Sequence, residues 1–107
     1  MGMDSYILTD IRQKNLEVTN NYLAYWRRNY AIDELMAGIF YQRGGHGNRN
    51  NLPMPITIEN LRWLRDRLTD DDVAYCDMSA RIERRDFFQR MEEMINGGTA
   101  IYYYVSY

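Results

Sequence analysis

The sequence predicts an α+β fold with about three helices, one of them long and central, packed on a small antiparallel sheet formed by the N- and C-terminal strands. Two observations predict this fold. β-branched and aromatic residues concentrate at residues 5–9 and 99–106, near the two ends of the chain. Between them, apolar residues recur at helical spacing. At 107 residues, the chain has the size of one domain, which we assign to residues 3–107. Residues 1–2 read as a cloning remnant.

The first predicted strand, residues 5–9, is bounded by Asp4 and Asp10, and the last, residues 99–106, follows a pair of glycines. An isolated two-stranded ribbon is only marginally stable. We therefore expect the two strands to pair in antiparallel fashion, with one face on the helices, and the last strand to offer a free edge.

Residues 11–41 contain no proline and only one glycine, Gly38, so a single helix of about 45 Å is permitted. Its apolar residues follow two different faces: Leu16, Leu23, Trp26 and Tyr30 on one, and Ile32, Leu35, Met36, Ile39 and Phe40 on the other. Either the helix bends near residues 29–33, or a single continuous helix is surrounded on nearly all sides by the rest of the chain. We favour the surrounded central helix.

Residues 43–53 are rich in glycine and asparagine and form a predicted flexible loop. Pro53 and Pro55 then keep the chain extended before Thr57, which is placed to cap a helix that continues through Leu68. The aspartates at 70–72 are expected to end that helix.

A third helix is predicted over residues 79–96, ending at Gly97 as left-handed caps prefer. Arg84 falls on its apolar side. Because a buried arginine requires a carboxylate, we predict an ion pair between Arg84 and Asp33, an acidic residue among apolar neighbours.

Composition excludes several classes of function. The net charge of −2 and pI near 5.3 disfavour non-specific nucleic-acid binding. The sequence contains neither a signal peptide nor the roughly 20 consecutive apolar residues of a membrane span, so a cytoplasmic protein without membrane contact is expected. Cys76 is the only cysteine, which leaves no partner for a disulfide within the chain.

The sequence offers little for catalysis. His46 is the only histidine and lies in a glycine-rich loop, without a second histidine or cysteine at metal-ligand spacing. Cys76 is followed by Asp77, and a neighbouring carboxylate raises rather than lowers the pKa of a thiol. We therefore predict no catalytic residue, no metal and no cofactor, and a protein that is not an enzyme.

Arginines interleaved with aromatic residues are the remaining signal. Lys14 is the only lysine among 13 basic residues, so the positive charge comes almost entirely from arginine. Arginine grips phosphates and aromatic rings stack on bases, so the pattern indicates a nucleotide site or a protein hot spot. The candidate ligand-binding residues are Tyr25, Trp26, Arg27, Arg28, Tyr30, Arg43 and Tyr103. The alternative is that most of these aromatic side chains belong to the core.

The segment Tyr25-Trp26-Arg27-Arg28-Asn29-Tyr30-Ala31-Ile32 resembles the YWRKANxIH signature of an uncharacterised family found in phages and prophages. Members of that family also tend to end in a tyrosine-rich strand, as residues 102–106 do here. Asn29 and Tyr30 replace the alanine and asparagine of the signature, and Asp33 replaces the histidine. The resemblance implies a phage origin.

Small acidic phage proteins that lack catalytic residues often act against host defence by binding. The first hypothesis is a non-enzymatic anti-defence protein in the host bacterial cytosol that sequesters a small anionic, nucleotide-type signalling ligand. A homo-oligomer is expected, because symmetric nucleotides suit two-fold interfaces. The alternative is a protein–protein inhibitor of a host defence enzyme, similar to an anti-CRISPR factor, with residues 70–72 and exposed tyrosines as its contact surface.

Overall fold

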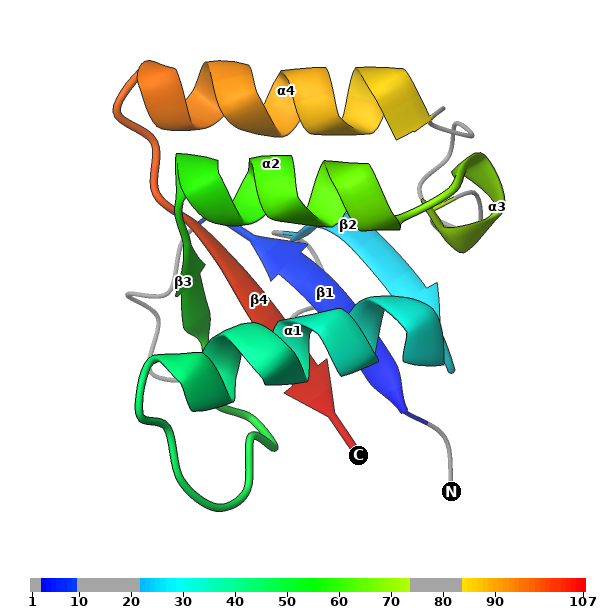
Figure 1. The fold of residues 1–107 in the computed structure, drawn as a ribbon, viewed down its shortest axis with the longest axis vertical. Helices are drawn as coiled ribbons and strands as arrows, with labels where there is room; N and C mark the ends of the chain where they lie inside the picture. The colour runs from blue at the N-terminus through cyan, green and yellow to red at the C-terminus, as the bar shows by residue number, and fades with distance from the viewer. Residues whose placement is uncertain (1–2, 10–21, 74–83) are drawn as a thin grey trace.

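The structure is a computed structural model that describes residues 3–9, 22–73 and 84–107. Its sheet has four strands in the order β2-β1-β4-β3, with every neighbouring pair antiparallel. The strands are β1 (Asp4–Leu8), β2 (Tyr22–Arg27), β3 (Met54–Ile56) and β4 (Ile101–Ser106). Figure 1 shows β1 and β4 side by side in the middle of the sheet.

The antiparallel pairing of the two terminal strands is confirmed. Tyr6 on β1 lies opposite Tyr104 on β4, and the same residue lies opposite Tyr25 on β2. The expectation that the last strand offers a free edge is wrong, because β3 pairs with the other side of β4. In β3, Pro55 has no N–H to donate, and its carbonyl already accepts a hydrogen bond from Arg43 Nη1 at 2.5 Å. This edge residue is therefore poorly suited to pair with a further strand.

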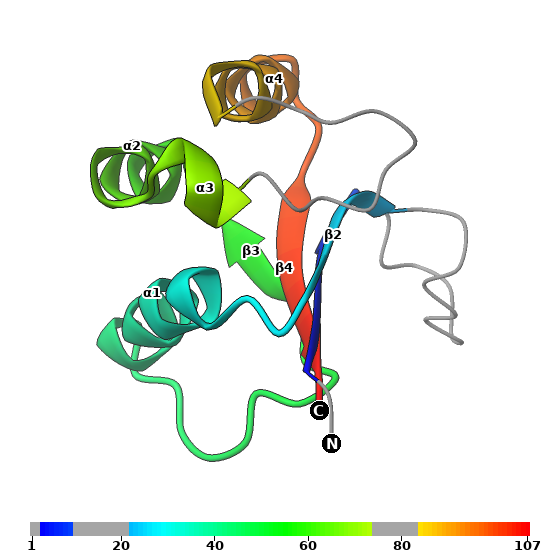
Figure 2. The same ribbon diagram turned by 90° about the vertical axis from the view of Figure 1, so that its right-hand side faces the viewer.

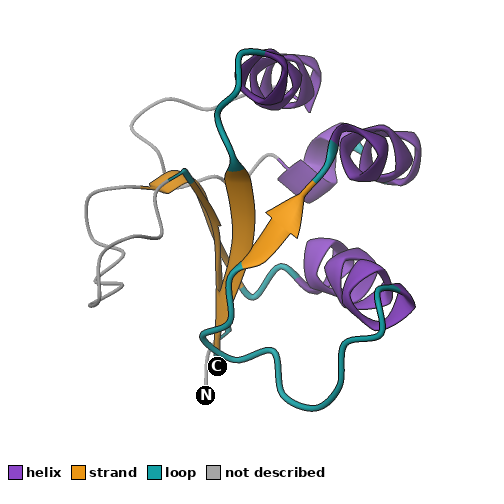
Figure 3. Ribbon diagram, turned by 90° about the vertical axis from the view of Figure 1, so that its left-hand side faces the viewer, coloured by secondary structure: helices purple, strands orange, loops and turns teal. Residues whose placement is uncertain are grey.

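The described helices are α1 (Tyr30–Gln42), α2 (Ile58–Arg67), the short α3 (Asp70–Val73) and α4 (Arg84–Asn96). Figures 2 and 3 show that they lie on one side of the sheet, which makes two layers. The α+β class is therefore confirmed. The long central helix is wrong: α1 and α4 each have 13 residues, and neither is surrounded by the rest of the chain.

In β2, the side chains of residues 24–27 are buried and exposed in alternation, as expected for a strand with one face on the core. Ala24 and Trp26 are buried against the helices, Tyr25 is half-buried on the other face and Arg27 is exposed, which is the two-residue period of a sheet. The side-chain carbonyl of Asn29 then accepts the Ile32 N–H and starts α1. Trp26 and Tyr30 are four residues apart, which is the spacing of one helix face, but Trp26 lies in β2 and Tyr30 begins α1. Leu16 lies outside the described residues.

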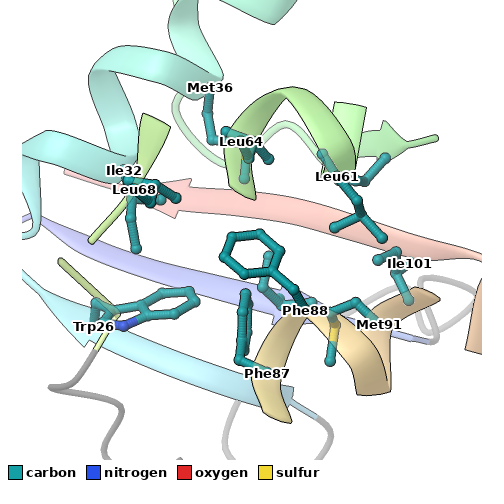
Figure 4. Close-up of a pocket in the computed structure, with 12 residues that line it drawn as sticks. Trp26, Ile32, Met36, Leu61, Leu64, Leu68, Phe87, Phe88, Met91 and Ile101 are labelled. Atoms are coloured by element: carbon teal, nitrogen blue, oxygen red, sulfur yellow. The ribbon is translucent and has the colours of Figure 1, made fainter. Parts of the chain in front are cut away.

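The core fills the space between sheet and helices. Figure 4 shows residues from β2, α1, α2, α4 and β4 converging there, among them Trp26, Leu64 and Phe87. Trp26 packs edge-on against Phe87, with ring centroids 5.5 Å apart. The gap left between these side chains is about 10 Å³, which is too small for any ligand.

The helix ends differ in part from the sequence predictions. Thr57 caps α2 as predicted and forms a reciprocal capping box with Asn60. Asp70 belongs to a separate helical turn, α3, rather than marking the end of α2. At the end of α4, the residue with positive φ is Gly98, at 90°, not Gly97. The N–H of Thr99 bonds to the carbonyl of Met94 at 2.8 Å, which completes a Schellman motif.

Within residues 3–9, 22–73 and 84–107, no helix combines the length and apolar character needed to cross a bilayer.

Candidate functional site

A groove of about 220 Å³ opens where β2 passes into α1, and we call it the β2–α1 groove. One wall comes from the end of β2 and the start of α1, and the other comes from α3. The residues that line it are Trp26, Arg27, Arg28, Asn29, Tyr30, Asp71 and Asp72. Four of the seven predicted ligand-binding residues are thus brought together: Trp26, Arg27, Arg28 and Tyr30.

An unusual backbone turn shapes this groove. Arg28 has a φ of 55°, in the left-handed region that side-chain-bearing residues other than asparagine and aspartate seldom occupy. Its N–H donates to the carbonyl of Met3 at 2.7 Å, and its carbonyl accepts the N–H of Tyr30 at 3.1 Å. This turn joins β2 to α1, and both Arg27, at the end of β2, and Arg28, in the turn, are exposed.

The opposite wall is tied to this turn by hydrogen bonds. Asn29 Nδ2 donates to the carbonyl of Asp72 at 2.5 Å, and Trp26 Nε1 donates to the carbonyl of Val73 at 3.3 Å. The carboxylate of Asp72 accepts the N–H of Thr69 at 2.8 Å, so it is engaged in forming α3. The position of α3 beside the groove is therefore fixed by contacts with β2 and with the cap of α1.

Three charged side chains of the groove, those of Arg27, Arg28 and Asp71, are exposed to solvent. Within the described part of the chain, the guanidinium groups of Arg27 and Arg28 have no hydrogen-bond or ion-pair partner. Asp71 is also exposed and has no such partner there. The side chain of Tyr30 is 63% exposed. These groups are available to a ligand, whereas Trp26, with 1% exposure, contributes only the floor of the groove.

The structure places the other three predicted residues elsewhere. Tyr25 lies on the sheet face opposite the helices, where its hydroxyl donates to Asp4 Oδ1 at 2.7 Å. This hydrogen bond to Asp4 is the main cause that raises the pKa of Tyr25 to about 12. Arg43 follows the last turn of α1 and binds the carbonyl of Pro55 and the side chain of Asn60. Neither residue lines the β2–α1 groove.

Tyr103, the last of the three, belongs to a largely buried polar cluster that we call the buried network, formed by Ser5, Asp33, Arg49 and Tyr103. The hydroxyl of Tyr103 donates to Asp33 Oδ1 at 2.9 Å and lies 3.0 Å from Ser5 Oγ. With 2% exposure, Tyr103 cannot stack on a ligand. Burial is the main cause that raises its pKa above the usual tyrosine value.

The predicted ion pair of Asp33 is corrected by the same network. Arg49 Nη1 and Nη2 donate to the two carboxylate oxygens of Asp33 at 2.7 and 2.9 Å, a bidentate pair. Asp33 therefore has an arginine partner as expected, but that partner is Arg49 and not Arg84, whose side chain lies outside the described part. Arg49 Nη2 also donates to the hydroxyl of Tyr107 at 2.9 Å.

Asn29, Asp71 and Asp72 line the groove but are not among the predicted ligand-binding residues. The sequence assigns residues 70–72 to the end of a helix or, in the alternative function, to a protein contact surface, because no local pattern places them beside residues more than forty positions earlier. Asn29 had a recognisable signal, since asparagine before an apolar helical stripe is a favoured N-cap. In the described residues, no group of three or more histidine, cysteine, aspartate or glutamate side chains is placed to hold a metal ion.

Comparison with protein-family models, with curated proteins and with solved structures found no match for this chain.

Proposed function

We propose that this protein is a non-enzymatic, phage-encoded anti-defence protein that binds and sequesters a small anionic ligand of the nucleotide type in the β2–α1 groove. One observation carries the proposal: two adjacent arginines, Arg27 and Arg28, line the same groove without a protein partner among the described residues. Arginine side chains that no carboxylate engages are available to bind an anion.

The groups around these arginines suit a phosphate attached to an aromatic base. Arg28 and Arg27 offer planar donor groups for phosphate oxygens. Tyr30 offers a largely exposed ring on which a base can stack. The groove also lies at the N-terminus of α1, whose helix dipole favours a nearby negative charge.

Backbone strain gives independent support for Arg28. A left-handed conformation costs a side-chain-bearing residue about 1–2 kcal/mol, and glycine would avoid most of that cost. Strained residues of this kind concentrate at binding and active sites. An arginine at this position is therefore better explained by its guanidinium group than by the fold. The likeness to the phage signature, which spans residues 25–32, supports the phage part of the proposal.

The proposal is tested by calorimetric titration of the protein with a panel of linear and cyclic nucleotides. We expect at least one nucleotide to bind, and to be recovered chemically unchanged when chromatography follows incubation. The double variant Arg27→Ala/Arg28→Gly should weaken that binding at least tenfold, because it removes both phosphate donors.

The matched control is Arg90→Ala, which removes an exposed arginine on α4 outside the groove. This variant should bind as the wild type does. Absence of binding to every nucleotide in the panel, with the protein folded by circular dichroism, would contradict the proposal. Binding that survives the double variant would place the ligand elsewhere, and conversion of the ligand would identify an enzyme.

A second candidate, a protein–protein inhibitor, is favoured by the exposed face of α1. Tyr30 and Tyr41 are 63% and 54% exposed. They are three helical turns apart, which places them on the same side of the helix to within about 20°. Exposed tyrosines are common anchors in protein interfaces. The variant Tyr41→Ala separates the two candidates, because Tyr41 lies at the end of α1 that is far from the groove. This variant should weaken the binding of a protein partner captured from a bacterial lysate and leave nucleotide binding unchanged.

A further inference from the structure

We infer that the β2–α1 groove takes a single nucleoside monophosphate and rejects nucleotides that carry phosphate at both ends of the ribose, such as cyclic dinucleotides. This inference rests on the proposed function and narrows its ligand class. It comes from the size of the groove and from Asp71, which lies on the wall opposite the arginines.

The volume limits the ligand to one nucleotide. Sites that bury a drug-sized molecule usually measure about 300–1,000 Å³. The groove, at about 220 Å³, falls below that range. A groove of this volume that opens to solvent covers at most part of one nucleotide, so a second nucleotide would lie outside it.

The charges give the ligand a direction. Arg27 and Arg28 stand on one wall, and Asp71 on the other. A phosphate placed on the arginines leaves the nucleoside toward Asp71, where its ribose hydroxyls or exocyclic amine can donate hydrogen bonds to the carboxylate. A second phosphate at the far end of the ribose would meet the same carboxylate as a like charge.

Asp71 cannot easily move away from this position. The next residue, Asp72, accepts a hydrogen bond from Asn29 through its carbonyl and from Thr69 through its carboxylate. Val73 then accepts the indole N–H of Trp26 and is 1% exposed. Because the backbone of α3 is held at these points, the carboxylate of Asp71 remains beside the groove.

Two carboxylates in α3 thus have different roles. Asp72 holds the backbone of α3, because its Oδ2 accepts the N–H of Thr69, so its substitution would disturb the fold. Asp71 is exposed and, in the described part of the chain, has no hydrogen-bond or ion-pair partner. Asp71 is therefore the residue whose charge can be changed without altering the groove, and it serves as the specificity determinant.

The test compares ligands that differ by one phosphate. The four ribonucleoside 5′-monophosphates are titrated by calorimetry, followed by the 3′,5′-bisphosphate of the one that binds most tightly. We expect the monophosphate to bind roughly fivefold to tenfold more tightly than the bisphosphate, as one additional like-charge contact near a protein surface implies. Asp71→Asn should bring this ratio close to one.

The control is Asp66→Asn, which removes an exposed carboxylate from α2, outside the groove. It lowers the net negative charge equally and should leave the ratio at its wild-type value. Equal or tighter binding of the bisphosphate by the wild type would overturn the inference, as would a ratio that Asp71→Asn leaves unchanged.

The proposed function and this inference fail in different ways. If a cyclic dinucleotide binds and no monophosphate does, the inference is overturned while the proposed function stands. If no nucleotide of any kind binds to the folded protein, both are overturned.

Discussion

Two clusters of arginine and carboxylate lie close to the N-terminal half of α1, and they use the same chemistry in opposite ways. In the buried network, both carboxylate oxygens of Asp33 accept hydrogen bonds from Arg49, and the two side chains are only 13% and 12% exposed. In the β2–α1 groove, Arg27 and Asp71 are exposed and are not paired with each other. An ion pair that the fold satisfies stabilises it, whereas charges left in a groove are available for binding.

The first turn of α1 links the two clusters. Asn29 caps α1, and its carbonyl accepts the N–H of Asp33 at 3.2 Å, so one helical turn separates the groove from the buried network. Tyr103 on β4 joins the network to α1 through Asp33 and to β1 through Ser5. We therefore expect substitutions in the network to change stability most strongly. Substitutions of the exposed groove residues Arg27, Arg28 and Asp71 should change binding without loss of stability.

The largest expected effect comes from Asp33→Ala. This substitution leaves the guanidinium of Arg49 without its carboxylate and removes an acceptor from Tyr103. Removal of one partner from a largely buried ion pair typically costs about 3–5 kcal/mol of unfolding free energy. Urea denaturation followed by tryptophan fluorescence measures the change.

Glu34→Ala is the control for this prediction, since Glu34 is the exposed neighbour of Asp33 on α1. Its effect should stay within about 0.5 kcal/mol. If Asp33→Ala were no more destabilising than Glu34→Ala, the network would not hold α1 on the sheet, and the contrast between the two clusters would be lost.

A smaller loss is expected for Tyr103→Phe. The ring keeps its place in the core, but Asp33 loses one donor and Ser5, with 0% exposure, loses the hydroxyl 3.0 Å from its own. An unsatisfied buried polar group typically costs about 1–3 kcal/mol. The same urea titration should show a loss below that of Asp33→Ala. A neutral result would mean that the hydroxyl of Ser5 finds another partner.

Stability should also fall at alkaline pH. The unfolded chain ionises its tyrosines near pH 10. In the folded protein, the pKa of Tyr25 is raised to about 12 by its hydrogen bond to Asp4, and that of Tyr103 is raised by burial. Between pH 10 and 12 the unfolded state therefore binds fewer protons than the folded state, and the free energy of unfolding decreases.

This alkaline effect can be assigned by repeating the urea titrations between pH 8 and 12. The stability that these tyrosines contribute is fully present below pH 10 and is lost as the pH rises through their folded pKa values. Tyr25→Phe and Tyr103→Phe should each reduce the slope. A slope that neither variant changes would assign the alkaline loss to other groups.

The sequence predicted the fold class and failed on its longest element for a physical reason. Strand formers at both ends of the chain and the cap at Thr57 act locally, so their patterns were sufficient. Residues 22–27 also carry apolar side chains at helical spacing, and only pairing with β1, a tertiary contact, decides that they form a strand. The positive φ of Arg28 separates this strand from α1, and no sequence rule places arginine there.

The candidate site was predicted only in part, because local sequence patterns can be recognised and tertiary contacts cannot. Arg27, Arg28 and Tyr30 are close in sequence and remain close in the groove, whereas Arg43 and Tyr103 were added by residue type alone and serve the fold instead. Asp71 could not be found, because it reaches the groove only through the contacts of α3 with Asn29 and Trp26.

The smallest change in stability is expected for Arg28→Gly, which should affect binding in the groove and leave the fold almost unchanged. Arg28→Gly removes the steric cost of a left-handed side-chain-bearing residue, while the added freedom of glycine in the unfolded chain offsets part of that gain. The free energy of unfolding should therefore stay within about 1 kcal/mol of the wild-type value and should not decrease, although the same variant weakens binding of the nucleotide.

Asn51→Gly is a suitable comparison, because Asn51 also has a positive φ, of 60°, but its side chain accepts a hydrogen bond from Tyr104 at 2.7 Å. We expect Asn51→Gly to lower stability and leave binding unchanged. If Arg28→Gly instead destabilised the protein as Asn51→Gly does, the guanidinium of Arg28 would serve the fold, and the groove would lose the residue that most distinguishes it from the buried network.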